Sequence, residues 1–217
     1  MTTTILLVRH GETNFNLEGK IQGHSTESVL TPKGIQGGNK LGEALKLSYI
    51  VDIIISSDLP RAADTAKILA DKLNIPRDSI IYDQRVREMY RGVWEGNCPY
   101  NSNEWKVFEK KLNQGVDYAP EGINIESYTS AMKRSKSLFD DLILQYKNKT
   151  ILVSSHGEIN KVFLGVSQNH NIQEVLLNDR KKYVQQNCCI NEIIIDNGSA
   201  CITKADYLIT GRQNGKR

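Results

Sequence analysis

The stretch LLVRHGET, residues 6–13, decides the fold and indicates where the chemistry lies. Residues 5–8 form a continuous apolar run with β-branched members, which is typical of a strand buried on both faces. The run stops at Arg9 and His10, and a glycine follows. A buried strand therefore delivers a guanidinium and an imidazole to its own C-terminal end.

Two further strand-like runs also end in polar side chains. Residues 150–154 run up to His156, and residues 51–55 lead through the segment SSDLP to Arg61. In an open α/β sheet, ligands bind beyond the carboxyl ends of parallel strands. Because guanidinium and imidazole donors attract negative charge, the ligand expected there is an anion, most simply a phosphate. One pocket is predicted to contain the residues at all three strand exits: Arg9, His10, Arg61 and His156.

The order of elements predicts a three-layer α/β/α fold with a mostly parallel central sheet. Strand patterns, including a short one at 80–82, alternate with helical patterns at 31–47, 62–73, 126–145 and 157–166. Apolar runs at 190–195 and 200–203, separated by Asn-Gly, favour a C-terminal hairpin with a type I′ turn.

Two irregular segments are expected near the pocket. Residues 14–30 are predicted to be a loop over the exit of the first strand. Residues 83–120, which hold both tryptophans, are predicted to be a small insertion over the site. The Lys-rich part of that insertion, residues 106–111, is expected to be a short solvated helix.

Length and composition are typical of an ordinary globular protein. The 217 residues suit a single domain spanning 1–217, with no linker. A net charge of +3 is too small to favour nucleic acid or a membrane as partner. The four cysteines lack CxxC spacing, and Cys188 and Cys189 are adjacent, so reduced thiols are expected rather than disulfides or a zinc site. The first residues lack a basic signal region, so a cytoplasmic location is predicted.

Four motifs, in order, resemble the signature of the histidine phosphatase superfamily, which includes phosphoglycerate mutases and many phosphomonoesterases. They are LVRHGET with Asn16, SSDLPRA with a following TA, RE with a following GVWEG, and SHG. The resemblance spans roughly residues 5–195. Arg-His-Gly alone would be a weak signal, but four ordered motifs are difficult to explain by chance.

The resemblance implies a phosphomonoesterase that works through a phosphohistidine. It implies His10 as the nucleophile and Glu88 as the acid that protonates the leaving oxygen. It also implies that the other motif residues hold the phosphoryl group or the substrate: Arg9, Asn16, Gln22, Gly23, Arg61, His156 and Gly157. No metal or other cofactor is expected, because two guanidiniums and a second imidazole supply the positive charge. The expected partner is a small-molecule phosphate ester, and a homodimer is an alternative to a monomer.

Some assignments have competitors. Glu95 competes with Glu88 for the role of acid, although the position of the RE motif favours Glu88. His24 could contact substrate, whereas His170 is expected at the surface. Glu158 occupies a place where the family often has Gly or Asn, which bears on substrate selectivity.

Three functions are compatible with the resemblance. A phosphatase is favoured over a phosphoglycerate mutase, because mutases of this family carry an Arg-Arg pair in the insertion and a Tyr at the position of Arg91. A non-catalytic phosphate-binding scaffold is disfavoured by the intact His10 and Glu88. The sequence does not identify the ester. Three lysines of the insertion could attract a polyanionic one, although a solvated face is the favoured interpretation: Lys106, Lys110 and Lys111.

Overall fold

The computed structural model describes residues 2–208, so Met1 and residues 209–217 of the predicted domain lie outside the described residues. Within residues 2–208, six strands form one sheet in the order β3-β2-β4-β1-β5-β6. The first four of these are mutually parallel, and β5 runs antiparallel to both of its neighbours. The predicted mostly parallel sheet is confirmed. The strand bounds are β1 Thr3–Arg9, β2 Ile53–Ser56, β3 Ile81–Tyr82, β4 Thr150–Ser155, β5 Ile190–Asp196 and β6 Ser199–Tyr207.

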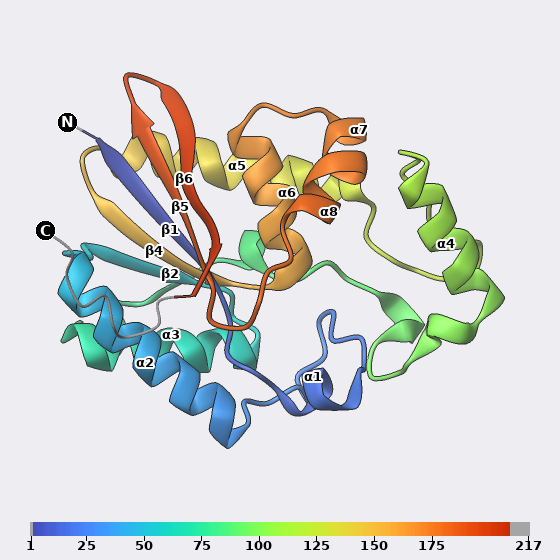
Figure 1. Ribbon diagram of the computed structural model, residues 1–217, viewed down its shortest axis with the longest axis horizontal. Helices are drawn as coiled ribbons and strands as arrows, with labels where there is room; N and C mark the ends of the chain where they lie inside the picture. The colour runs from blue at the N-terminus through green and yellow to red at the C-terminus, as the bar shows by residue number, and fades with distance from the viewer. Residues whose placement is uncertain (1, 209–217) are drawn as a thin grey trace, which may run out of the picture.

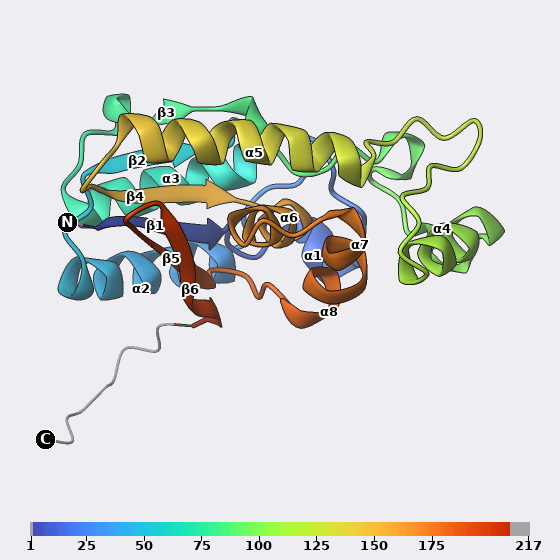
Figure 2. The same ribbon diagram turned by 90° about the horizontal axis from the view of Figure 1, so that it is seen from above.

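Helices cover both faces of the sheet, which confirms the three layers. Figures 1 and 2 show α2 and α3 on one face and α5 and α6 on the other. Short helices lie toward the end of the sheet where the parallel strands finish. The helix bounds are α1 Asn14–Glu18, α2 Pro32–Ser48, α3 Pro60–Leu73, α4 Asn103–Asn113, α5 Tyr128–Gln145, α6 Gly157–Ser167, α7 Ile172–Glu174 and α8 Arg180–Lys182.

The residues of β1 alternate between two hydrophobic clusters. Ile5 and Leu7 belong to the cluster that includes α5 and α6, whereas Leu6 and Val8 belong to the one that includes α2 and α3. All four side chains are completely buried. Burial of each is worth roughly 1.5–3 kcal/mol, so the central strand is held from both sides. The continuous apolar run in the sequence has this physical origin.

The connections that leave β1 and β4 diverge to opposite faces of the sheet. The two strands are adjacent and in register, with Arg9 opposite Ser155. The chain leaving β1 continues to α2 on one face of the sheet, whereas the chain leaving β4 enters α6 on the other. Because the connections diverge, the carboxyl ends of β1 and β4 form the topological switch point, or crevice, at which open α/β sheets bind ligands.

Close backbone packing fixes the exit of β1 against the start of α2. A Cβ placed on Gly11 would lie 2.6 Å from the carbonyl oxygen of Gly34, so only glycine fits there. Thr31 caps α2 by accepting from the backbone N–H of Gly34 at 3.0 Å, and Pro32 occupies the first turn, as predicted.

The predicted hairpin is confirmed. β5 and β6 are joined through Asn197 and Gly198, whose φ angles are +49° and +81°. Positive φ at both central residues is the requirement of a type I′ turn. The second strand extends to Tyr207, beyond the predicted end at residue 203.

Two expectations for the irregular segments need correction. Residues 14–30 are not entirely loop, because a capping box between Thr13 and Asn16 starts α1. The Lys-rich helix α4 is only half solvated, since Phe108 and Leu112 on its inner face are buried. Phe108 packs edge to face with Trp94 at 5.2 Å between ring centroids, so the lysines occupy the outer face of an anchored helix.

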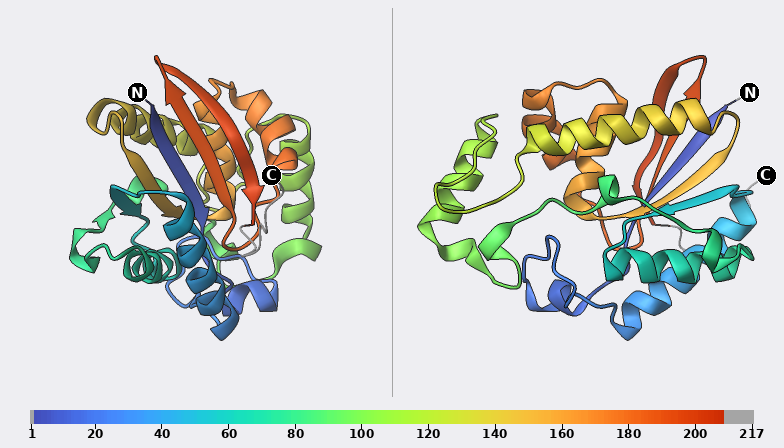
Figure 3. Two further views of the ribbon diagram at one scale, coloured as in Figure 1. Left: turned by 60° about the vertical axis from the view of Figure 1, so that its left-hand side comes forward. Right: turned by 180° about the vertical axis from the view of Figure 1, so that it is seen from behind.

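The predicted insertion lies beyond the carboxyl ends of the parallel strands. In Figure 2, α4 and its flanking loops extend past the ends of β1 and β4, and Figure 3 shows the same segment from behind. Residues 168–189, for which no element was predicted, fold back over α6 as α7, a π-helical turn Val175–Asp179 and α8. Within residues 2–208, none of the helices has the length and apolarity required to cross a bilayer.

Candidate active site

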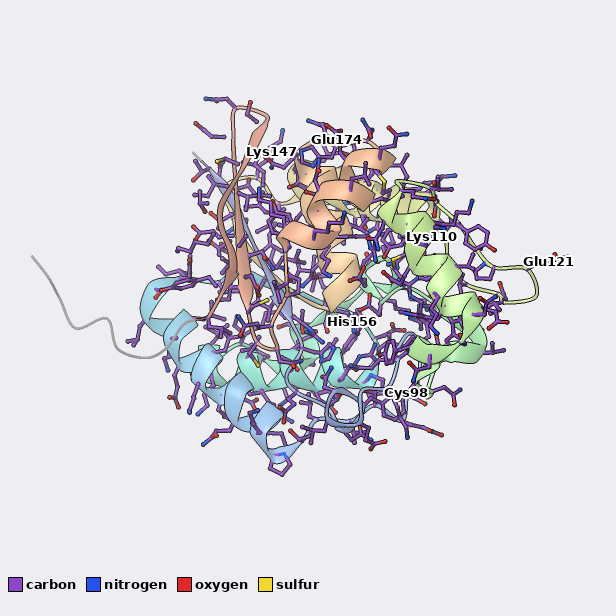
Figure 4. All side chains as sticks on the ribbon, turned by 45° about the vertical axis from the view of Figure 1, so that its right-hand side comes forward. Cys98, Lys110, Glu121, Lys147, His156 and Glu174 are labelled. Atoms are coloured by element: carbon purple, nitrogen blue, oxygen red, sulfur yellow. The ribbon has the colours of Figure 1, made fainter. Side chains whose placement is uncertain are left out.

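The four polar residues from the three strand exits converge at the crevice. His10 is 2% exposed, and Arg61 and His156 are fully buried. In Figure 4, His156 lies at the centre of the molecule, below α6, while Lys110 and Glu121 lie on the protruding segment. The rings of His10 and His156 are in contact, and the charges of Arg61 and Arg9 act on both imidazoles, so the structure brings these residues together.

A hydrogen bond fixes the tautomer of His10. Its Nδ1 lies 2.7 Å from the carbonyl oxygen of Gly11. A carbonyl oxygen can only accept, so Nδ1 carries the hydrogen and Nε2 presents a lone pair. The backbone is held as well, because His10 N donates to Ser155 O at 3.0 Å, across the β1–β4 pair. His10 is thus a neutral, oriented imidazole with a free nucleophilic nitrogen.

His156 is oriented by a hydroxyl that the motif analysis had not singled out. Its Nε2 shares a hydrogen bond of 2.8 Å with Ser57 Oγ, at the end of β2. Its other ring nitrogen, Nδ1, is buried without a partner. The rings of His10 and His156 lie edge to face, 5.3 Å between centroids.

The two arginines are held by backbone carbonyl groups. Arg61 donates to Gly23 O at 2.7 Å and to Ser25 O at 3.2 Å. Arg9 donates through Nη1 to the carbonyl oxygen of Gln185. Among residues 2–208, no carboxylate pairs with either guanidinium through a hydrogen bond, so both charges are available to an anion.

Buried polar atoms without hydrogen-bond partners gather in this cluster. Across residues 2–208, the buried side-chain atoms with no hydrogen-bond partner include Arg9 Nε, Arg61 Nε and His156 Nδ1. Buried polar atoms are normally satisfied, and a group of unsatisfied ones calls for an explanation. The two guanidinium N–H groups and the imidazole nitrogen suit the oxygens of a phosphoryl group placed at the lone pair of His10 Nε2.

The electrostatics of the crevice also favour an anion. Burial, followed by the charges of Arg61 and Arg9, holds the pKa of His10 well below its ordinary value. Burial and Arg61 lower the pKa of His156 in the same way. Burial lowers the pKa of Arg61 itself to about 10. All three shifts reflect a desolvated, positive site, and a bound dianion would offset them.

Glu88 lies at the N-terminus of α6. Its Oε1 accepts from the backbone N–H groups of Met89 at 2.9 Å and Ile159 at 3.1 Å. Its Oε2 accepts only from Glu158 N, at 3.2 Å. Since α6 begins directly after His156, the same helix start positions both the second imidazole and the carboxyl group.

Glu95 has a different environment. Its Oε1 accepts from the backbone N–H groups of His24 at 2.9 Å and Arg91 at 2.8 Å, so it ties two loops together. Residue 23 has a φ of +45°, and a Cβ there would lie 2.0 Å from Glu95 Oε1. Gly23 therefore permits the contact that Glu95 makes.

Asn16 and Gln22 belong to a polar network beside the crevice. Asn16 Oδ1 accepts from Thr13 Oγ1 at 3.0 Å and from Asn187 Nδ2 at 3.2 Å, which directs its NH₂ group away from these partners. Gln22 Oε1 accepts from Ser28 Oγ at 2.7 Å. Asn187 also donates to the carbonyl oxygen of His10 at 3.0 Å, so the segment before β5 closes over the β1 exit.

The remaining histidines lie outside the cluster. His24 Nε2 donates to the carbonyl oxygen of Glu88 at 2.8 Å, and its ring borders a hollow of about 460 Å³ together with Tyr90. His170 is partly exposed and pairs with the buried Asp179 at 2.9 Å. The predicted surface histidine is therefore tied to a buried carboxylate. No group of three or more metal-ligating side chains is found within residues 2–208.

Several supporting residues were missed by sequence reasoning. Ser57 lies inside a quoted motif, and its place at a strand exit was a usable signal. Thr65, which accepts from Gly11 N at 3.0 Å, lies one helical turn after Arg61. Gln185 and Asn187 gave no signal, because their segment has no periodic pattern and reaches the site only through the fold.

Comparison with known proteins gives a consistent result. The family model of the histidine phosphatase superfamily (branch 1) matches residues 5–206. A probable phosphoglycerate mutase GpmB from Erwinia tasmaniensis is 32% identical over 192 residues, covering 87% of this chain and 83% of that protein. A protein of the same description from Yersinia pestis is 38% identical over 158 residues, covering 70% and 69%.

Solved structures agree in fold. A variant of Entamoeba histolytica phosphoserine phosphatase in complex with phosphoserine has a TM-score of 0.79 at 30% identity, covering 95% of this chain and 98% of that chain. The phosphatase from that organism in complex with 3-phosphoglyceric acid has a TM-score of 0.79 at 32% identity, covering 94% and 97%. A mycobacterial glucosyl-3-phosphoglycerate phosphatase shares the fold at 19% identity, with a TM-score of 0.79 and coverage of 95% and 99%. The family match, the two crevice histidines and the shared fold have one explanation: the chain belongs to the histidine phosphatase superfamily.

Proposed function

We propose that the protein is a phosphomonoesterase that hydrolyses a small phosphate ester through a phosphohistidine at His10. The observation that carries the proposal is the lone pair on His10 Nε2, set among buried donors that lack partners. These are the components that a phosphoryl transfer requires: a nucleophile in line with the leaving group, and fixed donors around the transferred oxygens.

In the first step, the phosphate dianion binds to the guanidinium groups of Arg9 and Arg61 and to His156. Asn16 contributes its amide NH₂ group. His10 Nε2 then attacks phosphorus, a P–N bond forms, and the bond from phosphorus to the leaving oxygen breaks. Donors fixed by the fold before substrate arrives stabilise the spread negative charge without reorganisation.

Glu88 has the proposed role of acid and then base. Its Oε2 has a single backbone donor, whereas Oε1 has two, so Oε2 is the oxygen left to carry a proton. That proton goes to the leaving oxygen of the ester. A water molecule then loses its proton to Glu88, attacks the phosphohistidine, and releases inorganic phosphate and free His10.

Hydrolysis is proposed over mutase activity. The Entamoeba histolytica neighbours are phosphatases, whereas the curated bacterial relatives are described as probable phosphoglycerate mutases. Two features of the chain support hydrolysis. Arg91 replaces the Tyr expected of the mutases, and the insertion lacks their Arg pair.

The proposal includes metal independence and a cytoplasmic location. The two guanidiniums provide the positive charge that a metal ion would otherwise provide, and the neutral imidazole of His156 adds a polar contact to the phosphoryl group. The cysteines, which are free in the described part of the chain, suit a reducing compartment.

A panel of phosphate esters tests the function. Phosphoserine, phosphoglycerates, sugar phosphates and nucleotides are incubated with the protein, with and without EDTA, and phosphate release is measured. Release that is insensitive to EDTA supports the proposal. Interconversion of 2- and 3-phosphoglycerate without phosphate release would replace it with a mutase, and loss of activity with EDTA would overturn the metal-free mechanism.

A further inference from the structure

A second group of buried donors without partners lies next to Glu88. Across residues 2–208, three more buried side-chain atoms that can donate have no hydrogen-bond partner: Arg91 Nη1, Arg180 Nη1 and Arg180 Nε. The other unpartnered atoms outside the first cluster are two isolated oxygens, Ser135 Oγ and Asn160 Oδ1. Arg91 is 7% exposed, and the Arg180 side chain is 11% exposed. Unpaired guanidinium N–H groups at this depth are costly unless an acceptor arrives.

The two arginines contact one aromatic ring. The guanidinium carbon of Arg91 lies 5.7 Å from the ring centroid of Tyr128, and that of Arg180 lies 5.6 Å from it. Arg91 also lies 5.5 Å from the ring of Phe108, on α4. Stacking on aromatic rings fixes guanidinium groups without using their hydrogen-bond donors. Segments from the insertion, α5 and α8 thus build one rigid cationic site.

The carboxylates of the cluster do not consume all of its positive charge. Glu158 accepts from Tyr128 Oη at 2.7 Å and pairs with Lys161 at 2.5 Å, but it lies 3.8 Å from Arg180 Nε, too far for a hydrogen bond. Glu109 pairs with Arg180 at 3.1 Å. The three cations Lys161, Arg180 and Arg91 therefore face these two carboxylates, and Glu88 is a third carboxylate whose charge acts on Arg91. One positive charge is left unbalanced when Glu88 is protonated.

The electrostatics agree with this charge balance. Although burial raises the pKa of Glu158, the charges of Lys161 and Arg180 outweigh it and lower that pKa to about 2. Glu158 is therefore a permanent anion at neutral pH, and the surplus charge cannot be removed by its titration.

The site borders the proposed catalytic acid. Glu158 N donates to Glu88 Oε2 at 3.2 Å, so Glu158 links the cluster to the oxygen assigned to carry the proton. The Glu88 carboxylate is also one of the charges that raise the pKa of Arg91, against the opposing effect of burial. When Glu88 holds a proton for the leaving oxygen, Arg91 loses that counter-charge, and an incoming anion can replace it.

We infer that Arg91 and Arg180 form a specificity subsite for a carboxylate on the leaving group of the phosphate ester. This inference rests on the proposed phosphomonoesterase function. A single carboxylate matches the one positive charge that is left unbalanced when Glu88 is protonated, and its two oxygens suit the unpaired N–H groups of the planar guanidinium forks. The substrate class is a small phosphorylated hydroxy acid or phosphorylated amino acid.

Two matched pairs of esters test the subsite. Phosphoethanolamine is phosphoserine without its carboxylate, and glycerol 1-phosphate is 3-phosphoglycerate with a hydroxymethyl group in place of the carboxylate. The ratio of kcat/KM within each pair measures the preference for the carboxylate. The wild-type enzyme is expected to prefer the carboxylate in at least one pair, and the preferred pair distinguishes an amino acid from a hydroxy acid.

Three variants locate the preference. Arg91→Gln and Arg180→Gln are each expected to lower the preference roughly 10- to 100-fold, the range for one lost hydrogen bond to a charged group. Arg77→Gln is the matched control, because Arg77 is an exposed arginine that pairs with Asp71 outside both clusters, and it should keep the wild-type preference. An equal fall in kcat/KM for all four esters in the Arg91 and Arg180 variants would overturn the inference. So would the absence of any preference for the carboxylate esters in the wild-type enzyme.

If the protein is not a phosphatase, the experiment with the four esters gives a different result. In that case none of the four esters releases phosphate, and the subsite is tested by binding instead. His10→Ala protein should bind 3-phosphoglycerate more tightly than glycerol 1-phosphate in calorimetry, and adding Arg180→Gln should remove the difference. Equal binding of the two esters by the His10→Ala protein contradicts the subsite whatever reaction the enzyme catalyses.

Discussion

The imidazoles of His10 and His156 lie edge to face with 5.3 Å between their centroids, at the ends of two adjacent parallel strands. The register of β1 and β4 sets this relationship, because Arg9 faces Ser155 and each histidine is the first residue after its strand. One imidazole is fixed by a backbone carbonyl group and the other by a hydroxyl group. The two can therefore take different roles, one as nucleophile and one as donor to the phosphoryl oxygens.

The first prediction concerns His10. His10→Ala should reduce turnover by on the order of 10⁴-fold or more, and it should abolish covalent uptake of phosphate, because no other group can replace the nucleophile. Uptake is measured with a ³²P-labelled ester and acid-labile counting. His170→Gln, a histidine outside the cluster, should retain the label. Persistent acid-labile label on the His10→Ala protein would show that the phosphoryl group is carried elsewhere.

The second prediction concerns stability below neutral pH. His10 and His156 have folded pKa values well below the ordinary value, so the unfolded chain binds more protons as the pH falls through about 6.5. The free energy of unfolding should therefore fall on acidification, by up to roughly 1.4 kcal/mol per pH unit for each histidine.

Urea denaturation at pH 7.5, 6.5 and 5.5 measures this dependence. His156→Gln should give a shallower slope than the wild-type protein, since glutamine does not titrate. Inorganic phosphate should raise the midpoint, because it binds the folded site alone. An unchanged slope in the variant would mean that His156 is not the source of the pH dependence.

The third prediction concerns the anchor of α4. Phe108→Ala should cost about 3–5 kcal/mol of unfolding free energy, the usual range for a buried aromatic side chain. Phe108 is 2% exposed and supports both Trp94 and Arg91. Lys106→Ala, on the exposed face of the same helix, should stay within about 0.5 kcal/mol of wild type. Equal losses of unfolding free energy for the two substitutions would mean that α4 is not anchored by Phe108, and would support the solvated helix predicted from the sequence.

The contrast between His10 and Arg180 shows which parts of the site can be predicted from sequence. His10, Arg61 and His156 follow strands or start helices, and the rule that parallel strands present their carboxyl ends together brings them to one place. Arg180 lies in a segment for which no element was predicted, and its contact with Tyr128 depends on how residues 168–189 fold back over α6. No local pattern encodes such a contact.

The same limit explains the error over α4. Lys106, Lys110 and Lys111 gave the segment a charged appearance, but Phe108 and Leu112 are spaced by four residues and form a narrow apolar stripe. Such a short stripe does not show which other segment of the chain packs against it. The aromatic cluster around Phe108 includes Trp94, which lies in the GVWEG part of the third motif and not next to α4 in the sequence. The prediction of a single domain from 1 to 217 stays a prediction.

The last prediction separates Glu88 from Glu95. If Glu88 protonates the leaving oxygen, Glu88→Gln should slow the cleavage of an alkyl phosphate by roughly 10²- to 10⁴-fold, the usual contribution of a positioned acid or base. Glutamine can keep one acceptor oxygen toward the backbone N–H groups of Met89 and Ile159, so the loop and the start of α6 should stay in place.

The loss should depend on the leaving group. The leaving oxygen of p-nitrophenyl phosphate is stable as an anion and needs little protonation, so Glu88→Gln should be much closer to wild type on this ester than on an alkyl phosphate. Glu95 accepts from the backbone N–H groups of His24 and Arg91, and its proposed role is to hold these loops. Glu95→Gln should therefore affect both esters alike. Both variants are measured on both esters, and a selective loss on the alkyl ester in Glu95→Gln, with Glu88→Gln unaffected, would exchange the two roles.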